Sequence, residues 1–250
     1  GPGLSLIAEA AGLSYFAEIP AVIWNVQRVG PSTGLPTRTS QADLLAAYHL
    51  SHGDTKHVVL LPGNIKECFE FSQLSLDLAE RLQTLVIGLS DLDLGMNLHQ
   101  SVDFEYPSRA FDRGKVLGAK ELEEVQNFAR YKDVDGDGIA YRTLPGTEHE
   151  KAAYFTRGTG HDEKSNYTES PEVYKALMDR LDKKHHTAQA LVPKPIVHKE
   201  SKSELGILSF GSTHEALTES VSEFDISYMR VRALPLTDEV LEFIKSKKVI

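Results

Sequence analysis

Apolar and polar positions follow two different periods over the first ninety residues. Some segments have apolar residues at helical spacing, which predicts helices, and others are short apolar runs, which predict buried strands. The predicted helices are 4–18, 41–51 and 65–83, and the predicted strands are 21–27, 57–61 and 84–89. Helices and strands that alternate in this order are typical of a mostly parallel sheet covered by helices. The chain is therefore predicted to have an α/β fold.

This alternation is lost between residues 91 and 169, where the chain becomes polar and rich in Gly, Asp and Pro. Within this excursion, only 120–130 has apolar positions at helical spacing. Irregular segments of such length inside a compact protein are usually functional or cover an interface. A long helix is predicted to begin at Ser170, which can cap it ahead of Pro171, and to end near residue 190.

A linker and a second α/β unit are predicted beyond that helix. Residues 192–204 contain two prolines and several charges without a regular period. The pattern then predicts strand, helix, strand and helix over 205–210, 213–224, 226–231 and 237–246. The predicted organisation is a first domain over 1–191, which includes the excursion 91–169, a linker over 192–204, and the start of a second domain over 205–250.

The residues after the first predicted strand have the composition of an anion-binding loop. They read Gln27-Arg28-Val29-Gly30-Pro31-Ser32-Thr33-Gly34-Leu35-Pro36-Thr37. An arginine fork matches a carboxylate or phosphate, hydroxyl groups add donors, and ligands of open α/β sheets bind at the carboxyl ends of strands. We therefore predict that Arg28, Ser32, Thr33 and Thr37 contact an anion. The alternative is that Arg28 pairs with an aspartate at a strand end and that the Gly and Pro residues only turn the chain.

Two other segments carry candidate chemistry. Asp133, Asp135 and Asp137 occupy the alternating positions that converge on a cation in a Ca²⁺ loop, but Leu144 stands where such a loop needs a glutamate. The sequence therefore allows either a structural Mg²⁺ or Ca²⁺ site or a plain Asp/Gly turn. His161 follows a glycine-rich bend, where an imidazole suits acid/base chemistry; the alternative is a histidine that packs or caps a helix in a surface turn.

Charge and cysteine content exclude several classes of protein. The formal net charge of −9 argues against a nucleic-acid-binding surface, which needs a basic face. Cys68 is the single cysteine, so this chain can hold neither an internal disulfide nor an iron–sulfur cluster. No apolar run is long enough to span a bilayer, and no secretory pattern opens the chain. We expect an acidic cytoplasmic enzyme subunit, with any electron-transfer cluster in a partner.

Five segments carry a resemblance to a known family. They are Gly1-Pro2-Gly3-Leu4-Ser5-Leu6, the loop from Gln27 to Thr37, Tyr141-Arg142-Thr143-Leu144-Pro145-Gly146, the run from Tyr154 to Glu163, and Gly206-Ile207-Leu208-Ser209-Phe210-Gly211-Ser212-Thr213. Together they resemble the α subunit of the 2-oxoacid:ferredoxin oxidoreductases, thiamine diphosphate-dependent enzymes that include the 2-oxoglutarate and pyruvate synthases. The resemblance spans nearly all 250 residues.

The resemblance implies a fold and a place in a longer subunit. It implies a thiamine-diphosphate-binding domain of the pyrimidine type, of which an N-terminal part precedes Gly1, followed by a truncated transketolase-C-terminal-like domain. In the family, the arginine and the two threonines of the loop motif approach the carboxyl or 2-oxo end of the substrate. Those residues correspond to Arg28, Thr33 and Thr37.

The resemblance also implies a reaction and partners. A 2-oxoacid, coenzyme A and oxidised ferredoxin give an acyl-CoA, CO₂ and reduced ferredoxin. In the family, the β subunit mainly holds the diphosphate of the cofactor, its Mg²⁺ and a [4Fe-4S] cluster. We therefore expect a hetero-oligomer with that β subunit, and we expect this chain alone to be inactive and to bind thiamine diphosphate weakly or not at all.

The substrate and two alternative functions stay open at this point. The segments after Tyr141 match 2-oxoglutarate-type α subunits more fully, which favours 2-oxoglutarate over pyruvate. The second carboxylate of 2-oxoglutarate needs another cationic or hydroxyl partner. Arg38 is a candidate for this partner; the alternative is that Arg38 is an ordinary surface charge. The alternatives are a non-catalytic α/β module in which the loop from Gln27 to Thr37 binds another anion, and a transketolase-like thiamine enzyme that acts on sugar phosphates without ferredoxin.

Overall fold

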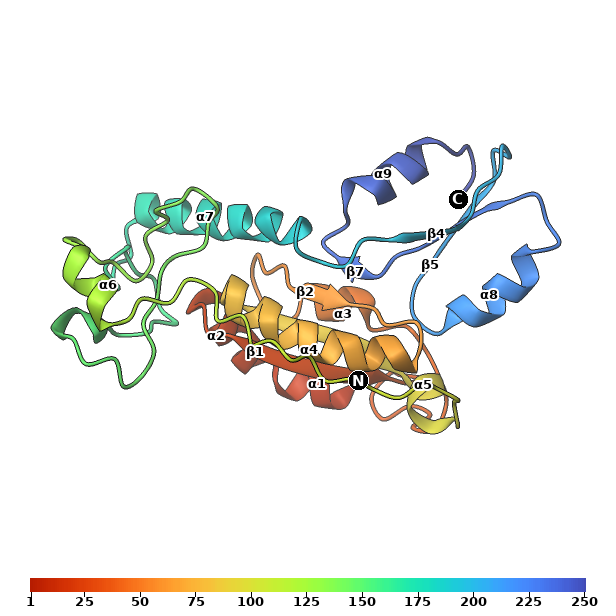
Figure 1. Ribbon diagram of the computed structural model, residues 1–250, viewed down its shortest axis with the longest axis horizontal. Coiled ribbons are helices and arrows are strands. Elements are labelled where there is room, and N and C mark those ends of the chain that lie inside the picture. The colour runs from red at the N-terminus through yellow and green to blue at the C-terminus, as the bar shows by residue number, and fades with distance from the viewer.

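Two β-sheets organise the chain in the computed structural model, which describes residues 1–250 (Figure 1). The first sheet has the order β1-β3-β2-β7 and the second the order β4-β6-β5. The strands are β1 (Ala21–Gln27), β2 (Val58–Leu60), β3 (Leu85–Asp91), β4 (Ile196–Lys199), β5 (Gly206–Ser209), β6 (Ser227–Arg230) and β7 (Ala233–Leu234). Strands β1, β3 and β2 are parallel, as are β5 and β6. The predicted α/β class with a mostly parallel sheet is confirmed.

Nine α-helices and one 3₁₀-helix connect these strands. They are α1 (Pro2–Leu6), α2 (Ala8–Phe16), α3 (Leu44–Tyr48), α4 (Ile65–Leu82), α5 (Leu92–Met96), α6 (Ala119–Glu124), η1 (Glu150–Ala152), α7 (Pro171–Gln189), α8 (Thr213–Val221) and α9 (Asp238–Lys245). The side chain of Ser170 accepts a hydrogen bond from Val173 N at the start of α7, as predicted. None of these helices has both the length and the apolar character needed to cross a membrane.

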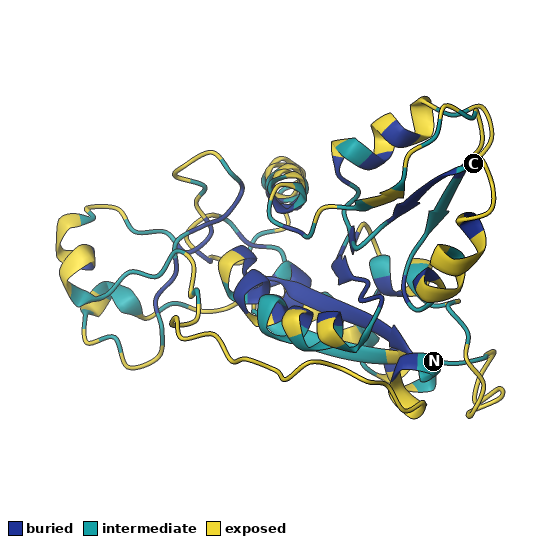
Figure 2. Cartoon of the chain, turned by 45° about the vertical axis from the view of Figure 1, so that its right-hand side comes forward, coloured by how far each residue is buried: buried dark blue, intermediate teal, exposed yellow.

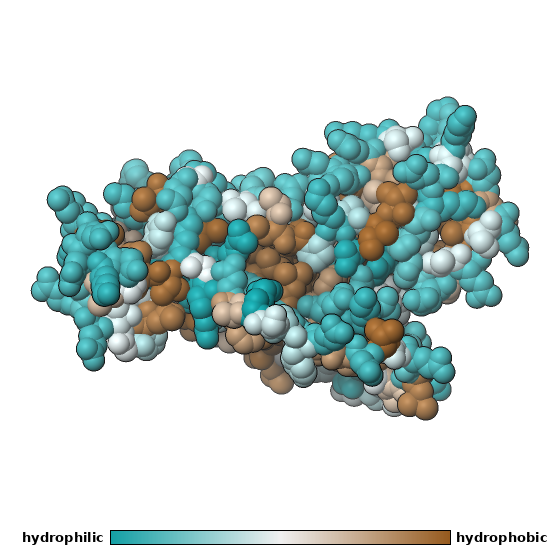
Figure 3. Space-filling model, in the orientation of Figure 1, coloured by the Kyte–Doolittle hydropathy of each residue, from teal (hydrophilic) through white to brown (hydrophobic).

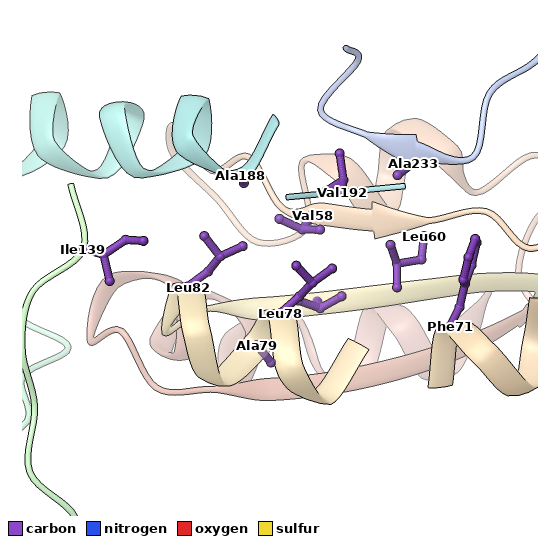
Figure 4. Close-up of a cluster of buried hydrophobic side chains, with 11 residues drawn as sticks. Val58, Leu60, Phe71, Leu78, Ala79, Leu82, Ile139, Ala188, Val192 and Ala233 are labelled. Atoms are coloured by element: carbon purple, nitrogen blue, oxygen red, sulfur yellow. The ribbon is translucent and has the colours of Figure 1, made fainter. Parts of the chain in front are cut away.

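The first sheet is covered on both faces, and its alternating side chains divide into two cores. Val58 and Leu60 point towards α4, where they pack with Phe71, Leu78 and Leu82 (Figure 4). Val59 of the same strand and Leu61, directly after it, belong to the opposite core, which includes residues of α1, α2 and α3. Every residue of the central strand β3 and of β2 is buried, whereas most of β1 is half-buried (Figure 2). This rigid sheet positions the loops at its ends.

The segment predicted to be a linker contains a strand, which corrects that expectation. Residues Ile196–Lys199 form β4, the antiparallel partner of β6 at one edge of the second sheet. An edge strand tolerates nearby prolines because one side of it needs no backbone donors, so the composition concealed it. A further strand, β7, returns to the first sheet, where Ala233 pairs with Leu60. The two units are therefore joined through a shared sheet.

Several predicted helices are shorter than their apolar pattern. The predicted helix 4–18 is divided at Ile7 into α1 and α2, 41–51 contracts to α3, and 120–130 contracts to α6. Residues between 91 and 169 otherwise form little regular structure, as expected (Figure 1). Part of this segment runs along α4, where Phe104 stacks on Phe69 with ring centroids 4.7 Å apart. On the face of the molecule seen in Figure 3, hydrophobic side chains gather near the middle, between α7 and α4, and the two ends are largely hydrophilic.

Candidate functional site

The predicted anion loop forms a closed hairpin at the carboxyl end of β1, beside α5 (Figure 1). Val29 N donates to Arg38 O at 3.0 Å, and Leu35 N donates to Val29 O at 3.0 Å. The first bond closes the neck of the hairpin, so Arg28 and Arg38 flank that neck. Residues 30–39 are exposed, and Arg28 is half-buried. The loop therefore presents its polar groups outward from a fixed base.

Gly34 is the residue that permits this turn. Its φ is +53°, and a Cβ built there would lie 2.0 Å from Val29 O. We expect Gly34→Ala to destabilise the loop by at least about 1 kcal/mol, because an L-residue pays for both the left-handed backbone and the clash. The matched control is Gly30→Ala, since a Cβ at Gly30 meets nothing within 4 Å. Equal thermal stability and equal hydrogen exchange of Leu35 N in the two variants would contradict this account.

Side chains below the loop hold its two ends to the sheet. Gln27 Nε2 donates to Ser90 O at 3.2 Å, and Gln27 Oε1 accepts from Asp43 N at 3.0 Å. Asp43 Oδ2 in turn accepts from Asn25 Nδ2 at 2.9 Å. Gln27 is 1% exposed, so these bonds form in a dry environment, where they are strong. The chain that leaves β1 and the chain that enters α3 are thus fixed to each other.

A second network joins the end of β3 and Gln41, which follows the loop, to the second unit. Asp91, at the end of β3, accepts from Ser212 Oγ at 2.6 Å and from Gln41 Nε2 at 3.0 Å. Gln41 Oε1 accepts from Thr213 Oγ1 at 2.9 Å. Our sequence reasoning missed Asp91 and Gln41. Asp91 could have been found from the sequence, because it is a polar residue at the end of a buried strand. The carboxyl ends of neighbouring parallel strands lie side by side, and Asp91 pairs in register with Gln27.

A buried ion pair ties the second sheet to the start of α4. The carboxylate of Glu67 accepts from Arg230 at 2.6 and 2.8 Å, from Arg232 at 3.0 Å and from Gly63 N at 2.8 Å. Burial alone would raise the pKa of Glu67, but the hydrogen bonds from Arg230 and Gly63 and the two guanidinium charges outweigh burial and lower it. Glu67 is therefore charged at neutral pH and fixes how the two units meet at this edge.

Arg28 itself has no acidic partner. No carboxylate lies within ion-pair distance of its guanidinium, whereas other arginines of the chain, such as Arg142, Arg180 and Arg230, pair with glutamates. The alternative in which Arg28 only balances an aspartate is therefore not what the structure shows. A cleft of about 500 Å³ lies at the same edge, between Asn64 and Ser212, but no residue of the loop lines it. The loop is thus exposed to solvent and lies outside this cleft.

The aspartates of the predicted cation turn are engaged by lysines instead of converging on a common point. Lys115 Nζ lies 2.7 Å from Asp135 and 2.8 Å from Asp137. Asp133 accepts from the backbone N–H groups of Gly136 and Gly138 and pairs with Lys183. No group of three or more His, Cys, Asp or Glu side chains in the structure could hold a metal ion. Of the two alternatives that the sequence allows, this geometry favours the Asp/Gly turn, here neutralised by lysines.

His161 is packed away from the loop. It is 2% exposed, its ring centroid lies 4.0 Å from that of Tyr131, and its Nδ1 lies 2.8 Å from Thr159 O. Burial lowers its pKa, so the neutral form predominates near pH 7. It also packs on Phe16 at the end of α2, before β1 begins, whereas the loop follows β1. The structure therefore supports the packing alternative for this histidine.

Comparisons with known proteins agree with this architecture. The family model described as "Pyruvate flavodoxin/ferredoxin oxidoreductase, thiamine diP-bdg" matches residues 1–170, more than half of the chain. The 2-oxoacid:ferredoxin oxidoreductase 2 subunit alpha of Aeropyrum pernix is 33% identical over an alignment of 237 positions, which covers 93% of this chain and 36% of that protein. The 2-oxoglutarate synthase subunit KorA of Methanocaldococcus jannaschii is 27% identical over an alignment of 258 positions, which covers 100% of this chain and 66% of that protein.

A solved structure is similar over the whole chain. It is the 2-oxoglutarate:ferredoxin oxidoreductase from Magnetococcus marinus with 2-oxoglutarate, coenzyme A and succinyl-CoA bound. The match has a TM-score of 0.85 and 28% identity, and it covers 100% of this chain and 44% of that one. The chain thus spans roughly a third to two thirds of the length of these relatives. The chain belongs to the thiamine-diphosphate-binding family of the pyruvate flavodoxin/ferredoxin oxidoreductases.

Proposed function

We propose that the chain is part of the α subunit of a 2-oxoacid:ferredoxin oxidoreductase and that its Arg28 loop binds the substrate carboxylate. The assembled enzyme converts a 2-oxoacid, coenzyme A and oxidised ferredoxin to an acyl-CoA, CO₂ and reduced ferredoxin. The observation that carries the proposal is an arginine without an acidic partner, held at the open carboxyl edge of the sheet. The family membership of residues 1–170 supports it.

The loop residues have distinct parts in this proposal. The guanidinium of Arg28 supplies the charge and a fork of donors for one carboxylate. The hydroxyl groups of Ser32, Thr33 and Thr37 lie on the exposed part of the loop, where they can donate to the remaining carboxylate or 2-oxo oxygens. A carboxylate held in this way fixes the position of the neighbouring 2-oxo carbon, which is the atom that must react.

The residues of this chain offer no complete cation site for the diphosphate end of thiamine diphosphate. That end needs a cation such as Mg²⁺, and no group of three or more His, Cys, Asp or Glu side chains here could hold one by itself. Cys68 is the single cysteine, so the donor set for a [4Fe-4S] cluster is also missing from this chain. We assign the diphosphate, Mg²⁺ and the cluster to the β subunit. This chain supplies the pyrimidine-side wall and the substrate contacts.

The general proposal is tested by an omission series with the full-length α chain, a matching β subunit, coenzyme A and an oxidised viologen dye under anaerobic conditions. Dye reduction should require all components together with a 2-oxoacid. An adaptor module would bind anions without any such reaction. A transketolase-like enzyme would transfer ketol groups between sugar phosphates and leave the dye oxidised.

We further propose 2-oxoglutarate as the substrate, with its second carboxylate near Arg38. The bond from Val29 N to Arg38 O places Arg38 at the neck of the hairpin beside Arg28. The similar enzyme from Magnetococcus marinus was solved with 2-oxoglutarate bound, which favours a dicarboxylate.

In the assembled complex, Arg38→Gln should lower kcat/KM for 2-oxoglutarate by about tenfold, the loss of one charge-assisted contact, and leave kcat/KM for pyruvate nearly unchanged. Pyruvate is the internal control because it lacks the second carboxylate. Equal losses of kcat/KM for both substrates would show that Arg38 does not bind the second carboxylate.

A further inference from the structure

A second cleft lies next to the amino end of β1, whereas the Arg28 loop follows the carboxyl end of that strand. Its volume is about 520 Å³, and it lies between Glu18, just before β1, and a segment that includes Arg130, Arg142, His149 and Tyr154. The seven residues of β1 separate this end from the loop. At the rise of a β-strand, that distance is about 23 Å. The cleft is therefore distinct from the proposed substrate site.

Two buried arginines line this cleft, and each keeps one nitrogen without a partner. Arg130 is 4% exposed and Arg142 is 7% exposed. Arg130 Nη2 donates to Glu18 O at 2.9 Å, but its Nη1 has no hydrogen-bond partner. Arg142 Nη2 donates to Glu80 and to Arg113 O, but its Nε has none. Buried donors usually have partners. Seven buried side-chain atoms of the chain lack one, and only these two belong to residues that line the cleft, so an acceptor bound there would satisfy donors that the protein leaves unpaired.

The other polar groups of the cleft leave a donor free and no strong acceptor. His149 Nδ1 accepts from Lys151 N at 3.0 Å, so the neutral ring carries its proton on Nε2 and can donate there. The hydroxyls of Thr143 and Thr147 already donate to backbone carbonyls. The carboxylate of Glu18 is 0% exposed and is bound by Arg180 and by Lys184. A ligand that enters the cleft therefore meets donors.

The charges near the cleft also favour an anionic ligand. Glu18 faces the cations Lys184, Arg180 and Arg130, and Glu80 pairs with Arg142 and Arg113. Five cations thus face two carboxylates. Asp133 also acts on Arg180, but it forms its own pair with Lys183. An anion in the cleft would reduce this local excess of positive charge.

We propose that this cleft binds a small anion through a carboxylate or phosphate group, held by Arg130, Arg142 and His149. The volume is that of a site for a metabolite-sized ligand. Arg130 is held in place for this role because its guanidinium lies 4.8 Å from the ring centroid of Tyr131 and 5.7 Å from that of Tyr154. In this proposal the segment from Arg142 to Gly146 helps to form an anion site that is separate from the Arg28 loop.

Titration calorimetry of the full chain tests the proposal, with inorganic phosphate and acetate in separate arms at constant ionic strength. All titrations use the Arg28→Ala background, so binding at the loop does not contribute. Saturable one-site binding of at least one anion is expected, and the arm that binds identifies phosphate or carboxylate chemistry. Failure of both anions to bind saturably at millimolar concentrations would overturn the proposal without bearing on the Arg28 loop.

A charge placed in the cleft is the decisive variant. In His149→Asp the new carboxylate can still accept from Lys151 N, so folding is preserved, but it repels an anion and removes the Nε2 donor. Binding should weaken about tenfold or more. Asn127→Asp makes the same charge change at an exposed residue that does not line the cleft, so it should bind as the parent does. Equal affinities in the two variants would place the anion elsewhere.

Discussion

Arg28→Ala is expected to lower kcat/KM for the 2-oxoacid by about 10- to 150-fold in the assembled enzyme. The reason is the loss of the proposed charge-assisted pair between Arg28 and the substrate carboxylate, worth about 1.5–3 kcal/mol. Folding should change little, because Arg28 is half-buried and makes no ion pair within the chain. The measurement is steady-state reduction of a viologen dye, together with thermal unfolding of each variant.

Two further variants test whether the loss of kcat/KM is specific to the guanidinium of Arg28. Arg28→Lys keeps the charge but loses the planar fork, so its kcat/KM should lie between those of the parent and Arg28→Ala. Arg81→Ala removes an exposed arginine whose nearest carboxylate, that of Asp112, is 3.7 Å away, and it should leave the kinetics unchanged. If Arg28→Ala retains full kcat/KM, the carboxylate assignment is wrong.

Glu18→Gln is expected to destabilise the chain by about 3–5 kcal/mol, since it leaves buried cations without their counter-charge. The carboxylate of Glu18 is fully buried and lies 2.8 Å from Lys184 Nζ and 3.1 Å from Arg180 Nη1. Denaturant unfolding measures the loss. Glu9→Gln is the matched control, because Glu9 is exposed and should change the free energy of unfolding by less than about 0.5 kcal/mol. Equal stabilities of the two variants would contradict the role of Glu18.

The same carboxylate makes stability depend on pH. Burial would raise the pKa of Glu18, but the charges of Lys184 and Arg180 outweigh burial and hold that pKa well below its ordinary value of 4.5. A lowered folded-state pKa gives stability that is present above the unfolded-state pKa and is lost as pH falls through the folded-state pKa. The stability gap between the parent and Glu18→Gln should therefore shrink in acid below about pH 4.

Much of the first sheet could be predicted because its strands carry their own signal. Strand β3 is apolar along most of its length since both faces are buried. Helix α4 is capped by Asn64, whose side chain accepts from Glu67 N at 2.9 Å. Strand β4 was missed because two prolines, Pro193 and Pro195, lie just before it and it occupies an edge position, where nearby prolines are tolerated. Its hydrogen bonds to β6 come from residues about thirty positions further along the chain, and no local pattern reports them.

The candidate site was predictable to a similar degree. The composition of the loop indicated an anion, and the structure places Arg28 at the end of β1 without an acidic partner. The roles of Asp91 and Gln41 depend on contacts with Ser212, which lies more than a hundred residues away in sequence. The Asp133 turn looked like a cation loop because spacing alone does not show that Lys115 approaches from another segment.

The most direct test of the Arg28 assignment is a structure of the assembled α and β subunits with the 2-oxoacid bound. The account predicts that the substrate carboxylate next to the 2-oxo carbon lies about 2.7–3.2 Å from the guanidinium of Arg28, with hydroxyl groups of the same loop completing its hydrogen bonds. A substrate carboxylate bound by other residues, with Arg28 turned towards solvent, would contradict the account.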